Sequence, residues 1–269
     1  MPNPLNNPAD SFDRSARAYD ELVARNREGC IRLINSLPER EFSRLLDVGC
    51  GTGFATLSAI ERRGVREVIG VDPSTGMLEV MADRLQDSPG VTSDLRPREV
   101  MDMGVAPGWA DLVLNTMALH WFTDRPGAIR AMAAALAPGG VLGILCPGEA
   151  HDRPTVDMLN ATGDPMLGRL SASIVNNEVP VPDITGWITD AGLEPVDVWA
   201  ETRHRVVTPQ AIADRMEAVA THLWSDLPDD EQADVLQRMR AAFAAAADPD
   251  GLYRYRFVKT FAVAQAPAG

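Results

Sequence analysis

The chain has 269 residues, 45% of them hydrophobic, which is enough for one large α/β domain or two small ones. Its 25 lysine and arginine residues against 38 aspartate and glutamate residues give a net charge of −13. Because nucleic acids and anionic membrane surfaces are bound largely through clustered basic residues, this balance argues against both as partners. It leaves a small molecule as the expected partner and predicts nothing about oligomeric state.

The cysteine content and the N-terminus indicate the compartment. Cys30, Cys50 and Cys146 form no C-x-x-C pair and no Cys/His ligand spacing, which predicts a metal-free protein in the reducing cytoplasm. Residues 1–10 are rich in proline and asparagine, which predicts a disordered arm rather than a signal segment. The longest apolar run, residues 131–146, is interrupted by Pro138-Gly139-Gly140 and is too short to span a bilayer. We therefore expect a soluble protein.

In the first half of the chain, short apolar runs alternate with segments of helical periodicity. Strands are predicted at residues 44–48, 67–71, 111–114 and 141–146. Helices are predicted at residues 11–37, after the glycines at 49–53 to about 62, from the cap Ser74 to about 86, and at about 125–136. This alternation predicts a doubly wound parallel sheet joined by right-handed crossovers, a Rossmann-like α/β fold.

After residue 146 the pattern loosens. Helical signals are mixed over residues 150–180, and a helix at 183–191 precedes a strand at 195–203. Thr208-Pro209 begins a helical stretch to residue 247 that is broken near Pro228, and residues 253–264 form a last strand. We expect a single domain over residues 11–269, with N-terminal helices at 11–40 and helical cap insertions at 150–182 and 208–247 over the working edge of the sheet.

The central motif is a glycine-rich turn between the first strand and its helix. Gly49, Gly51 and Gly53 follow Asp47, and Asp72 closes the next strand. Glycines at this position permit backbone angles that side chains forbid and let a ligand lie against bare main chain. An acid at the end of the second strand is placed to accept the two ribose hydroxyls of an adenosine.

The spacing of the glycines separates two kinds of adenosine site. A dinucleotide oxidoreductase has G-x-G-x-x-G/A, whereas this chain has G-x-G-x-G, and the sixth positions counted from Gly49 and Gly51 are Phe54 and Thr56. No G-K-[ST] follows, which excludes a P-loop. A tight structural turn with no ligand is the alternative, and the two flanking acids argue against it.

The stretch from Asp47 to Gly53 resembles the first motif of class I S-adenosylmethionine-dependent methyltransferases, and the stretch from Val68 to Leu78 resembles the second. Residues 111–115 and 137–142 resemble the later strand-helix-strand block, and residues 12–20 resemble the helical opening of the small-molecule branch. The resemblance is strong over residues 11–146. It implies a seven-stranded sheet with the last strand antiparallel, and S-adenosyl-L-methionine as the cofactor.

The resemblance also implies roles for single residues. The three glycines run beneath the methionine part of the cofactor, Asp72 holds the ribose, and Met77 packs on the adenine. It further assigns to the cofactor site Tyr19, on the cofactor carboxylate, Asn115, beside the methionine end, and Asp47, Cys50 and Pro73 within the motifs. In one respect this sequence departs from the family pattern. Family members contact the adenine amino group through the aspartate of a Gly-Asp-Ala motif near the third strand. The corresponding stretch here is Arg98-Glu99-Val100, so Glu99 and Val100 are the candidates, with Asp102 as the alternative acid.

His120 is the best-placed candidate for a general base, because it follows the strand at residues 111–114; the alternative is a packing histidine beside Trp121. Other candidates near the acceptor are Glu149, His151, His204 and His222, each with a structural alternative. Trp121, Phe122, Met166, Trp187 and Trp224 are candidates to wall an apolar cavity, although most are expected in the core. Arg203 and Arg205 suit a substrate carboxylate or a plain surface position.

The sequence thus predicts transfer of a methyl group from S-adenosylmethionine to an oxygen, nitrogen or carbon of a small molecule, by in-line displacement. It resembles the branch that contains trans-aconitate, quinone and carrier-protein-ester methyltransferases. The alternative is a methyltransferase-fold protein with a non-transfer role, such as a cyclase. An NAD-dependent oxidoreductase is disfavoured by the glycine spacing.

Overall fold

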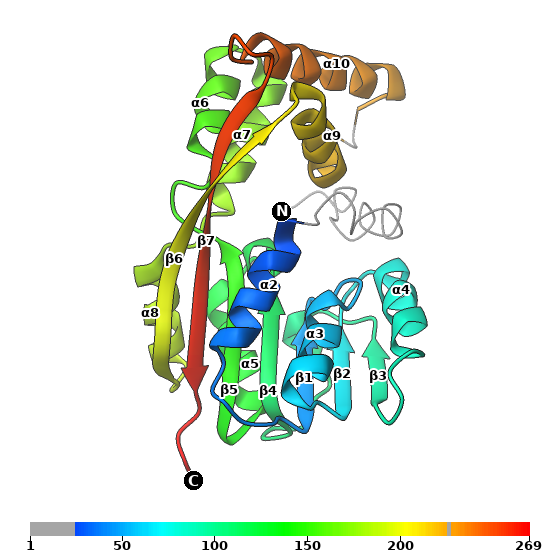
Figure 1. The fold of residues 1–269 in the computed structure, drawn as a ribbon, viewed down its shortest axis with the longest axis vertical. Helices are drawn as coiled ribbons and strands as arrows, with labels where there is room; N and C mark the ends of the chain where they lie inside the picture. The colour runs from blue at the N-terminus through cyan, green and yellow to red at the C-terminus, as the bar shows by residue number, and fades with distance from the viewer. Residues whose placement is uncertain (1–24, 225–226) are drawn as a thin grey trace.

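The computed structural model describes residues 25–224 and 227–269. Within them, seven strands form one sheet in the order β3-β2-β1-β4-β5-β7-β6 (Figure 1). The strands are β1 (Arg44–Val48), β2 (Glu67–Val71), β3 (Thr92–Arg96), β4 (Ala110–Thr116), β5 (Leu136–Pro147), β6 (Glu194–Val207) and β7 (Tyr253–Gln265). Strands β1 to β5 pair in parallel, and β7 is antiparallel to both of its neighbours, β5 and β6. The predicted Rossmann-like fold with an antiparallel last strand is confirmed.

Helices cover both faces of the sheet. The α-helices are α2 (Arg25–Ser36), α3 (Phe54–Arg63), α4 (Thr75–Leu85), α5 (Arg125–Ala135), α6 (Arg153–Ala161), α7 (Pro165–Asn176), α8 (Val181–Asp190), α9 (Pro209–Ala220) and α10 (Asp229–Ala245). One apolar core joins the sheet to α2, α3 and α4, and a second joins the opposite face to α5 and α8. Alternate residues of each buried strand face the two cores, as the pleat of a strand requires.

The helices α6, α7, α9 and α10 gather away from the sheet in a third core, which they share with the N-terminal end of β7 (Figure 1). Strand β7 pairs with β5 only from Lys259 onward, but with β6 from Tyr253 to Gln265. Strands β6 and β7 therefore form a two-stranded ribbon that continues beyond the sheet. This ribbon carries the four helices above the carboxyl edge of the sheet. We refer to α6, α7, α9 and α10 together as the cap helices.

Three strands differ from the prediction. Strand β3 was not predicted, because its sequence Thr-Ser-Asp-Leu-Arg is polar and lies at an exposed sheet edge. Strand β5 begins at Leu136, which pairs with Ala110 before the ladder is interrupted and resumes at Val141. Strand β6 is longer at both ends than the predicted residues 195–203, since it pairs with β7 along the whole ribbon.

The predicted arm at residues 1–10, the first part of the N-terminal helical region and Tyr19 lie outside the described residues. Within residues 25–224 and 227–269, no helix combines the length and the apolar character that a membrane crossing needs.

Candidate cofactor site

The glycine turn connects β1 to α3 with three residues in left-handed backbone conformations. The φ angles of Gly49, Gly51 and Gly53 are +69°, +52° and +81°, where a side chain is strained. A Cβ atom on Gly49 would lie 2.3 Å from the Cβ of Ala118, and one on Gly53 would lie 2.6 Å from Cγ of Met81. A Cβ on Gly51 would meet nothing within 4 Å. The outer two glycines therefore pack against protein, whereas Gly51 presents bare main chain to open space.

Asp72, at the end of β2, is held against this turn by main-chain donors. One carboxylate oxygen, Oδ2, accepts a hydrogen bond from the amide of Gly51 at 2.9 Å, and Oδ1 accepts one from the amide of Ser74 at 2.9 Å. Ser74 caps α4 by accepting from the amide of Met77 at 3.1 Å. The carboxylate is thus fixed in position before any ligand arrives, and its two oxygens have lone pairs for about four acceptor contacts.

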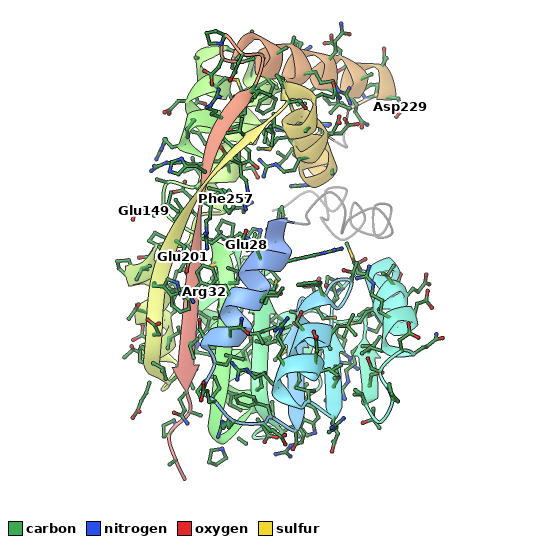
Figure 2. All side chains as sticks on the ribbon, in the orientation of Figure 1. Glu28, Arg32, Glu149, Glu201, Asp229 and Phe257 are labelled. Atoms are coloured by element: carbon green, nitrogen blue, oxygen red, sulfur yellow. The ribbon has the colours of Figure 1, made fainter. Side chains whose placement is uncertain are left out.

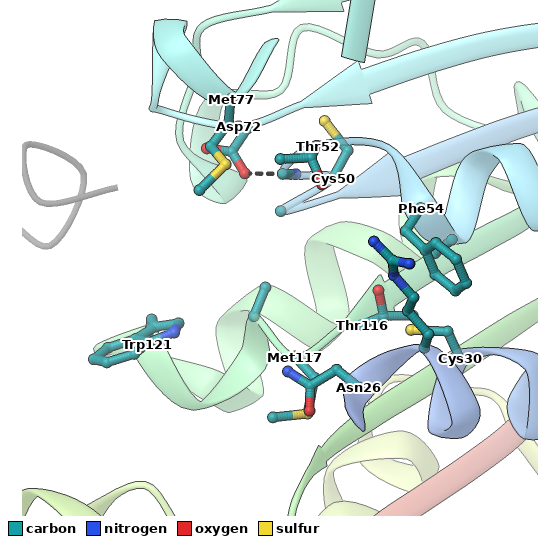
Figure 3. Close-up of a pocket in the computed structure, with 15 residues that line it drawn as sticks. Asn26, Cys30, Cys50, Thr52, Phe54, Asp72, Met77, Thr116, Met117 and Trp121 are labelled. Carbon is teal, nitrogen blue, oxygen red and sulfur yellow. Dashed lines mark hydrogen bonds between the residues drawn. The ribbon is translucent and has the colours of Figure 1, made fainter. Parts of the chain in front are cut away.

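A pocket opens along the carboxyl edge of the sheet beside Gly51 and Asp72. About 740 Å³ of it is free of atoms, part of this open to solvent. Its described lining is Asn26, Arg27, Cys30, Gly49, Cys50, Gly51, Thr52, Phe54, Ala55, Asp72, Met77, Thr116, Met117, Ala118 and Trp121. Asp72 and Met77 lie on one side of it, and Trp121, Met117 and Asn26 lie across from them (Figure 3).

This lining fits an adenosyl sulfonium. The bare main chain at Gly51 leaves room that a Cβ would fill, and the fixed Asp72 carboxylate is an acceptor for hydroxyl groups. Met77, which is 3% exposed, supplies an apolar surface for an aromatic base. Five of the predicted cofactor residues line this pocket: Gly49, Cys50, Gly51, Asp72 and Met77. Gly53, in the same turn, packs against Met81 instead. Their contacts with the cofactor remain a prediction.

Sequence reasoning missed much of the opposite wall. Asn26 and Cys30 come from α2, Thr116 is the last residue of β4, and Met117 follows it. Met117 has a φ of +56°, which is uncommon for a residue other than glycine, and its amide donates to the carbonyl of Leu145 at 2.6 Å. Such strain persists only where the surroundings enforce it, and it is concentrated at functional sites. No feature of the sequence around Met117 signals this conformation.

Asp47 lies beneath the pocket rather than in its wall. It is fully buried; Oδ2 accepts a hydrogen bond from the Thr56 hydroxyl at 2.6 Å, and Oδ1 has no hydrogen-bond partner among the described residues. Burial, opposed by the Thr56 hydrogen bond and reinforced by the charge of Asp72, raises the pKa of Asp47 to about 7. A cation bound in the pocket above would therefore favour the charged form of Asp47 over its protonated form.

We expect Asp47 to make the free protein less stable as the pH rises. The pKa of Asp47 is about 7 in the folded state, above the ordinary value of 3.8, so the folded state binds this proton more tightly than the unfolded state does. The free energy of unfolding therefore falls as the pH rises from about 4 to about 7. One pH unit across this window corresponds to about 1.4 kcal/mol at most. In Asp47→Asn this loss should disappear. Urea unfolding at pH 4.5 and 7.5 measures the difference, and an identical pH dependence in both proteins would show that Asp47 does not titrate in this window.

Asn115 lies at the end of β4 as predicted, but its side chain is occupied within the protein. Its Nδ2 donates to the carbonyl of Val48 at 2.8 Å, and its Oδ1 accepts from the amide of Leu119 at 2.9 Å. The side chain is fully buried and is not part of the pocket lining. Asn115 therefore joins β1 to the turn after β4 and lies directly behind Gly49 of the glycine turn, and its predicted contact with the cofactor stays a prediction.

The candidates near the third strand do not reach the pocket wall. Val100 is buried in the core under α5, and Glu99 and Asp102 are exposed, with Asp102 paired to Arg98 at 3.0 Å. Pro73 is exposed as well, directly after Asp72. The structure gives none of these residues a contact that identifies the partner of an adenine amino group.

His120 is buried at the edge of the pocket region and does not line the pocket. Its ring is 4.9 Å from that of Trp121, which does, and its Nδ1 has no hydrogen-bond partner among the described residues. Burial, followed by the nearby charges of His151 and Arg125, lowers the pKa of His120 to about 3. An imidazole with so low a pKa is a weak base, which together with its place outside the pocket lining fits the packing alternative; the general-base role of His120 stays an untested prediction.

This assignment predicts that His120 does not shape the pH dependence of turnover. We expect kcat/KM of His120→Asn to follow the same pH profile as the parent enzyme between pH 5.5 and 8.5, since the imidazole stays neutral throughout. A methyl-transfer assay across this range tests it. An inflection near pH 6.5 in the parent that is missing in the variant would restore His120 as the base.

The other predicted acceptor-site residues separate into three groups. Glu149 is exposed on the outside of the molecule (Figure 2), and His204 is exposed on β6. Phe122 and Trp187 pack against the core under α5 and α8, and Met166 and Trp224 belong to the cap core. His151 and His222 lie between sheet and cap, where the Nδ1 of His151 is 2.6 Å from the carbonyl of Val258 and His222 meets Trp121 edge-on at 5.4 Å.

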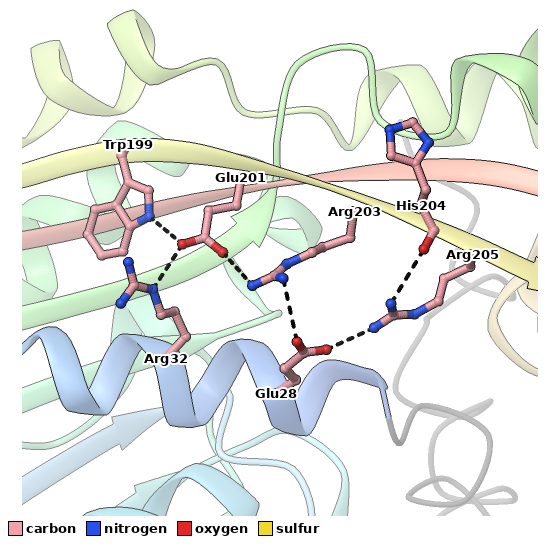
Figure 4. Close-up of polar contacts among 7 residues, drawn as sticks. All are labelled: Glu28, Arg32, Trp199, Glu201, Arg203, His204 and Arg205. Atoms are coloured by element: carbon pink, nitrogen blue, oxygen red, sulfur yellow. Dashed lines mark hydrogen bonds and ion pairs between the residues drawn. The ribbon is translucent and has the colours of Figure 1, made fainter.

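Arg203 and Arg205 are engaged in a surface network rather than directed at the pocket (Figure 4). Arg205 pairs with Glu28 at 2.8 Å, and Arg203 pairs with Glu201 at 3.1 Å. Glu201 also accepts from Arg32 at 2.9 Å, so the network joins α2 to β6. The surface alternative is therefore the one that the structure supports for both arginines.

Comparison with known proteins agrees with this geometry. A family model described as a methyltransferase domain matches residues 46–144. A trans-aconitate 2-methyltransferase of Variovorax paradoxus is 30% identical over 268 residues, which cover 95% of both chains. A malonyl-[acyl-carrier protein] O-methyltransferase of Dechloromonas aromatica is 34% identical over 140 residues, which cover 52% of this chain and 50% of the relative.

Among solved structures, phosphoethanolamine N-methyltransferase 2 of Haemonchus contortus in complex with S-adenosyl-L-methionine has the same fold. The TM-score is 0.61 at 19% identity, and the match covers 95% of this chain and 57% of that one. The glycine turn and its acid thus occur in a fold known to hold this cofactor. The chain belongs to the class I S-adenosylmethionine-dependent methyltransferases, in the branch that acts on small molecules, and S-adenosylmethionine is its cofactor.

Proposed function

We propose that the enzyme methylates a carboxylate oxygen of a small polycarboxylic acid of the trans-aconitate type, by direct in-line displacement. The observation that carries this proposal is the end-to-end match to a trans-aconitate 2-methyltransferase, whereas the malonyl-[acyl-carrier protein] relative is matched over only half its length. The net charge of −13 also opposes docking of an acidic carrier protein.

The chemistry of the site supports an acceptor that arrives without a proton. A carboxylate is ionised at neutral pH and needs no general base, which agrees with the low pKa of His120. Cys30 in the pocket wall is also held in its neutral form, since burial raises the pKa of its thiol to about 11. With such residues around it, the site acts by positioning the two reacting atoms about 3–3.5 Å apart.

Each part of the site has a distinct task in this reaction. S-adenosylmethionine supplies, when bound, a methyl group on a positively charged sulfur, which leaves as a neutral thioether. Gly51 and Asp72 hold the adenosyl part, and Met117 and Trp121 wall the end of the pocket from which an acceptor approaches. An acceptor oxygen that arrives already ionised would need no residue of the described wall to take a proton from it.

We also propose that the segments 150–182 and 208–247 cover the acceptor within one methyltransferase domain of residues 11–269. This is supported by the cap helices, which stand on the β6–β7 ribbon above the carboxyl edge of the sheet (Figure 1). The ring contact between Trp121 in the pocket wall and His222 after α9 links the two parts directly.

Incubation with S-adenosylmethionine and a panel of small acids tests the function. We expect trans-aconitate to yield a monomethyl ester, with S-adenosylhomocysteine formed in equal amount, both followed by mass spectrometry. Tricarballylate and fumarate probe the need for the double bond and the third carboxylate. Transfer only to an amine or carbon acceptor would contradict the proposal, and conversion of a substrate without S-adenosylhomocysteine would favour the non-transfer alternative.

A further inference from the structure

The junction between sheet and cap is lined by one face of β7. This face carries every second residue at the start of the strand: Tyr253, Tyr255, Phe257 and Lys259. Neighbouring aromatic rings on it are 6.3 Å apart. Phe257 lies where the strand leaves the sheet (Figure 2), and the amine of Lys259 is 5.6 Å from its ring. Lys259 is 4% exposed and donates to Asn26 of the pocket wall at 3.1 Å. The face therefore runs from the cofactor pocket into the cap.

Arg215 of α9 is buried against this face. It is 7% exposed, and its guanidinium lies 5.1 Å from the ring of Tyr255. Nη2 contacts Asp152 at 3.2 Å through a single hydrogen bond, while the other oxygen of Asp152 accepts from the Thr155 hydroxyl at 2.6 Å. Nε is buried and has no hydrogen-bond partner among the described residues.

A guanidinium in this state is incompletely satisfied. It offers five N–H donors in a planar fork, and its described hydrogen bonds, to Asp152 and to the sulfur of Met216, all come from Nη2. Leaving buried donors of a charged group unpaired is costly, so such groups are normally paired on most sides. The arrangement at Arg215 is therefore that of a site prepared for a further anion, and a planar carboxylate matches the fork.

Two connections lead from Arg215 to the cofactor pocket. Asp152 follows His151, whose charge contributes to the lowered pKa of His120, and His120 in turn packs on Trp121 of the pocket wall. The second connection is α9 itself, because His222, just beyond its end, contacts Trp121 at 5.4 Å. Arg215 thus lies in α9, the cap helix that leads directly to the residue in contact with the pocket wall.

We propose that Arg215 is the anchor for a second carboxylate of the acceptor, the one that is not methylated. This rests on the proposed function and narrows it to acids with at least two carboxylates. Asp152 holds the guanidinium in place through one N–H and leaves the others to the ligand. Phe257 and Tyr255 supply the apolar floor between the two carboxylates.

Steady-state kinetics with trans-aconitate test the anchor. In Arg215→Gln we expect the KM for trans-aconitate to rise at least tenfold, with a smaller change in kcat and an unchanged Kd for S-adenosylhomocysteine. Arg215→Lys keeps the positive charge but loses the planar fork of donors, so its KM for trans-aconitate should lie between those of the parent and Arg215→Gln. Arg240→Gln is the matched control, since Arg240 also pairs with acids of α9 but lies 40% exposed on the outer helix α10, and its KM should equal that of the parent.

Asp152→Asn separates anchoring from simple support of the cap. Asparagine tolerates the left-handed φ of +53° at this position, and its side-chain oxygen can still accept a hydrogen bond from the guanidinium although the negative charge is removed. If Arg215 anchors the acceptor, the KM for trans-aconitate should not rise in Asp152→Asn. If the ion pair only holds the cap together, both Asp152→Asn and Arg215→Gln should raise KM alike, with matching losses of melting temperature, and the proposal is overturned.

The outcomes distinguish this proposal from the function on which it rests. If the parent methylates trans-aconitate and Arg215→Gln retains the parent KM, the anchor is wrong and the proposed function stands. If the parent methylates only acceptors that lack a carboxylate, both fail together.

Discussion

Replacing Asp72 with alanine should weaken binding of S-adenosylhomocysteine by about ten- to a hundredfold. Hydrogen bonds to a charged group contribute about 1.5–3 kcal/mol, and a factor of ten corresponds to about 1.4 kcal/mol. The variant also removes the acceptor of the Gly51 amide, so the turn beneath the ligand loses a fixed contact. Calorimetric titration at constant ionic strength measures the change.

Two further variants make the result specific to the site. Asp72→Asn keeps the shape of the side chain but lacks the charge, so it should lie between the parent and the alanine variant. Glu79→Ala removes an exposed acid from α4 next to the site and should bind as the parent does. Parent-like affinity in Asp72→Ala, in a protein with an unchanged melting temperature, would remove Asp72 from the cofactor site.

Gly49→Ala should damage both folding and binding. Its new Cβ would lie 2.3 Å from the Cβ of Ala118, a methyl group with no rotamer to change, and the φ of +69° is strained for alanine. We expect the free energy of unfolding to fall by about 2–4 kcal/mol, because overpacking and backbone strain act together. Denaturant unfolding gives this number, and titration with S-adenosylhomocysteine gives the loss of affinity.

Two other glycines provide the comparison. Gly186→Ala, in α8, places its Cβ in open space and should leave stability unchanged or raise it by up to about 1 kcal/mol. Gly51→Ala also meets no protein atom, so it should destabilise the fold only through its strained φ of +52°, and its methyl group would enter the pocket and lower affinity as well. Equal effects of Gly49→Ala and Gly186→Ala on stability would show that the turn tolerates a side chain.

The sequence was sufficient to predict the turn and its acid because both depend on local chain geometry. Gly49, Gly51 and Gly53 are needed for positive φ angles, and Asp72 ends a strand that pairs in register with β1. In a parallel sheet, neighbouring strands end at the same edge, so the two motifs were expected to meet. Most of the central sheet was predictable for the same reason, since its strands are short, apolar and separated by helices.

The opposite wall of the pocket depends on tertiary packing and was not predictable in this way. Asn26 and Cys30 reach the site only because α2 packs across the sheet, and Met117 adopts its conformation under the constraint of Leu145. Asn115 and His120 were located on the correct segment, but whether a polar side chain faces the ligand or the interior depends on contacts from other strands. Periodicity carries no information on that choice.

The most direct test of the account is a crystal structure with S-adenosylhomocysteine bound. We predict that its two ribose hydroxyls donate to the carboxylate of Asp72, that its backbone passes over Gly51, and that its sulfur points toward Met117 and Trp121. Density for the ligand at another place on the sheet, or ribose hydroxyls that make no contact with Asp72, would contradict the site described above.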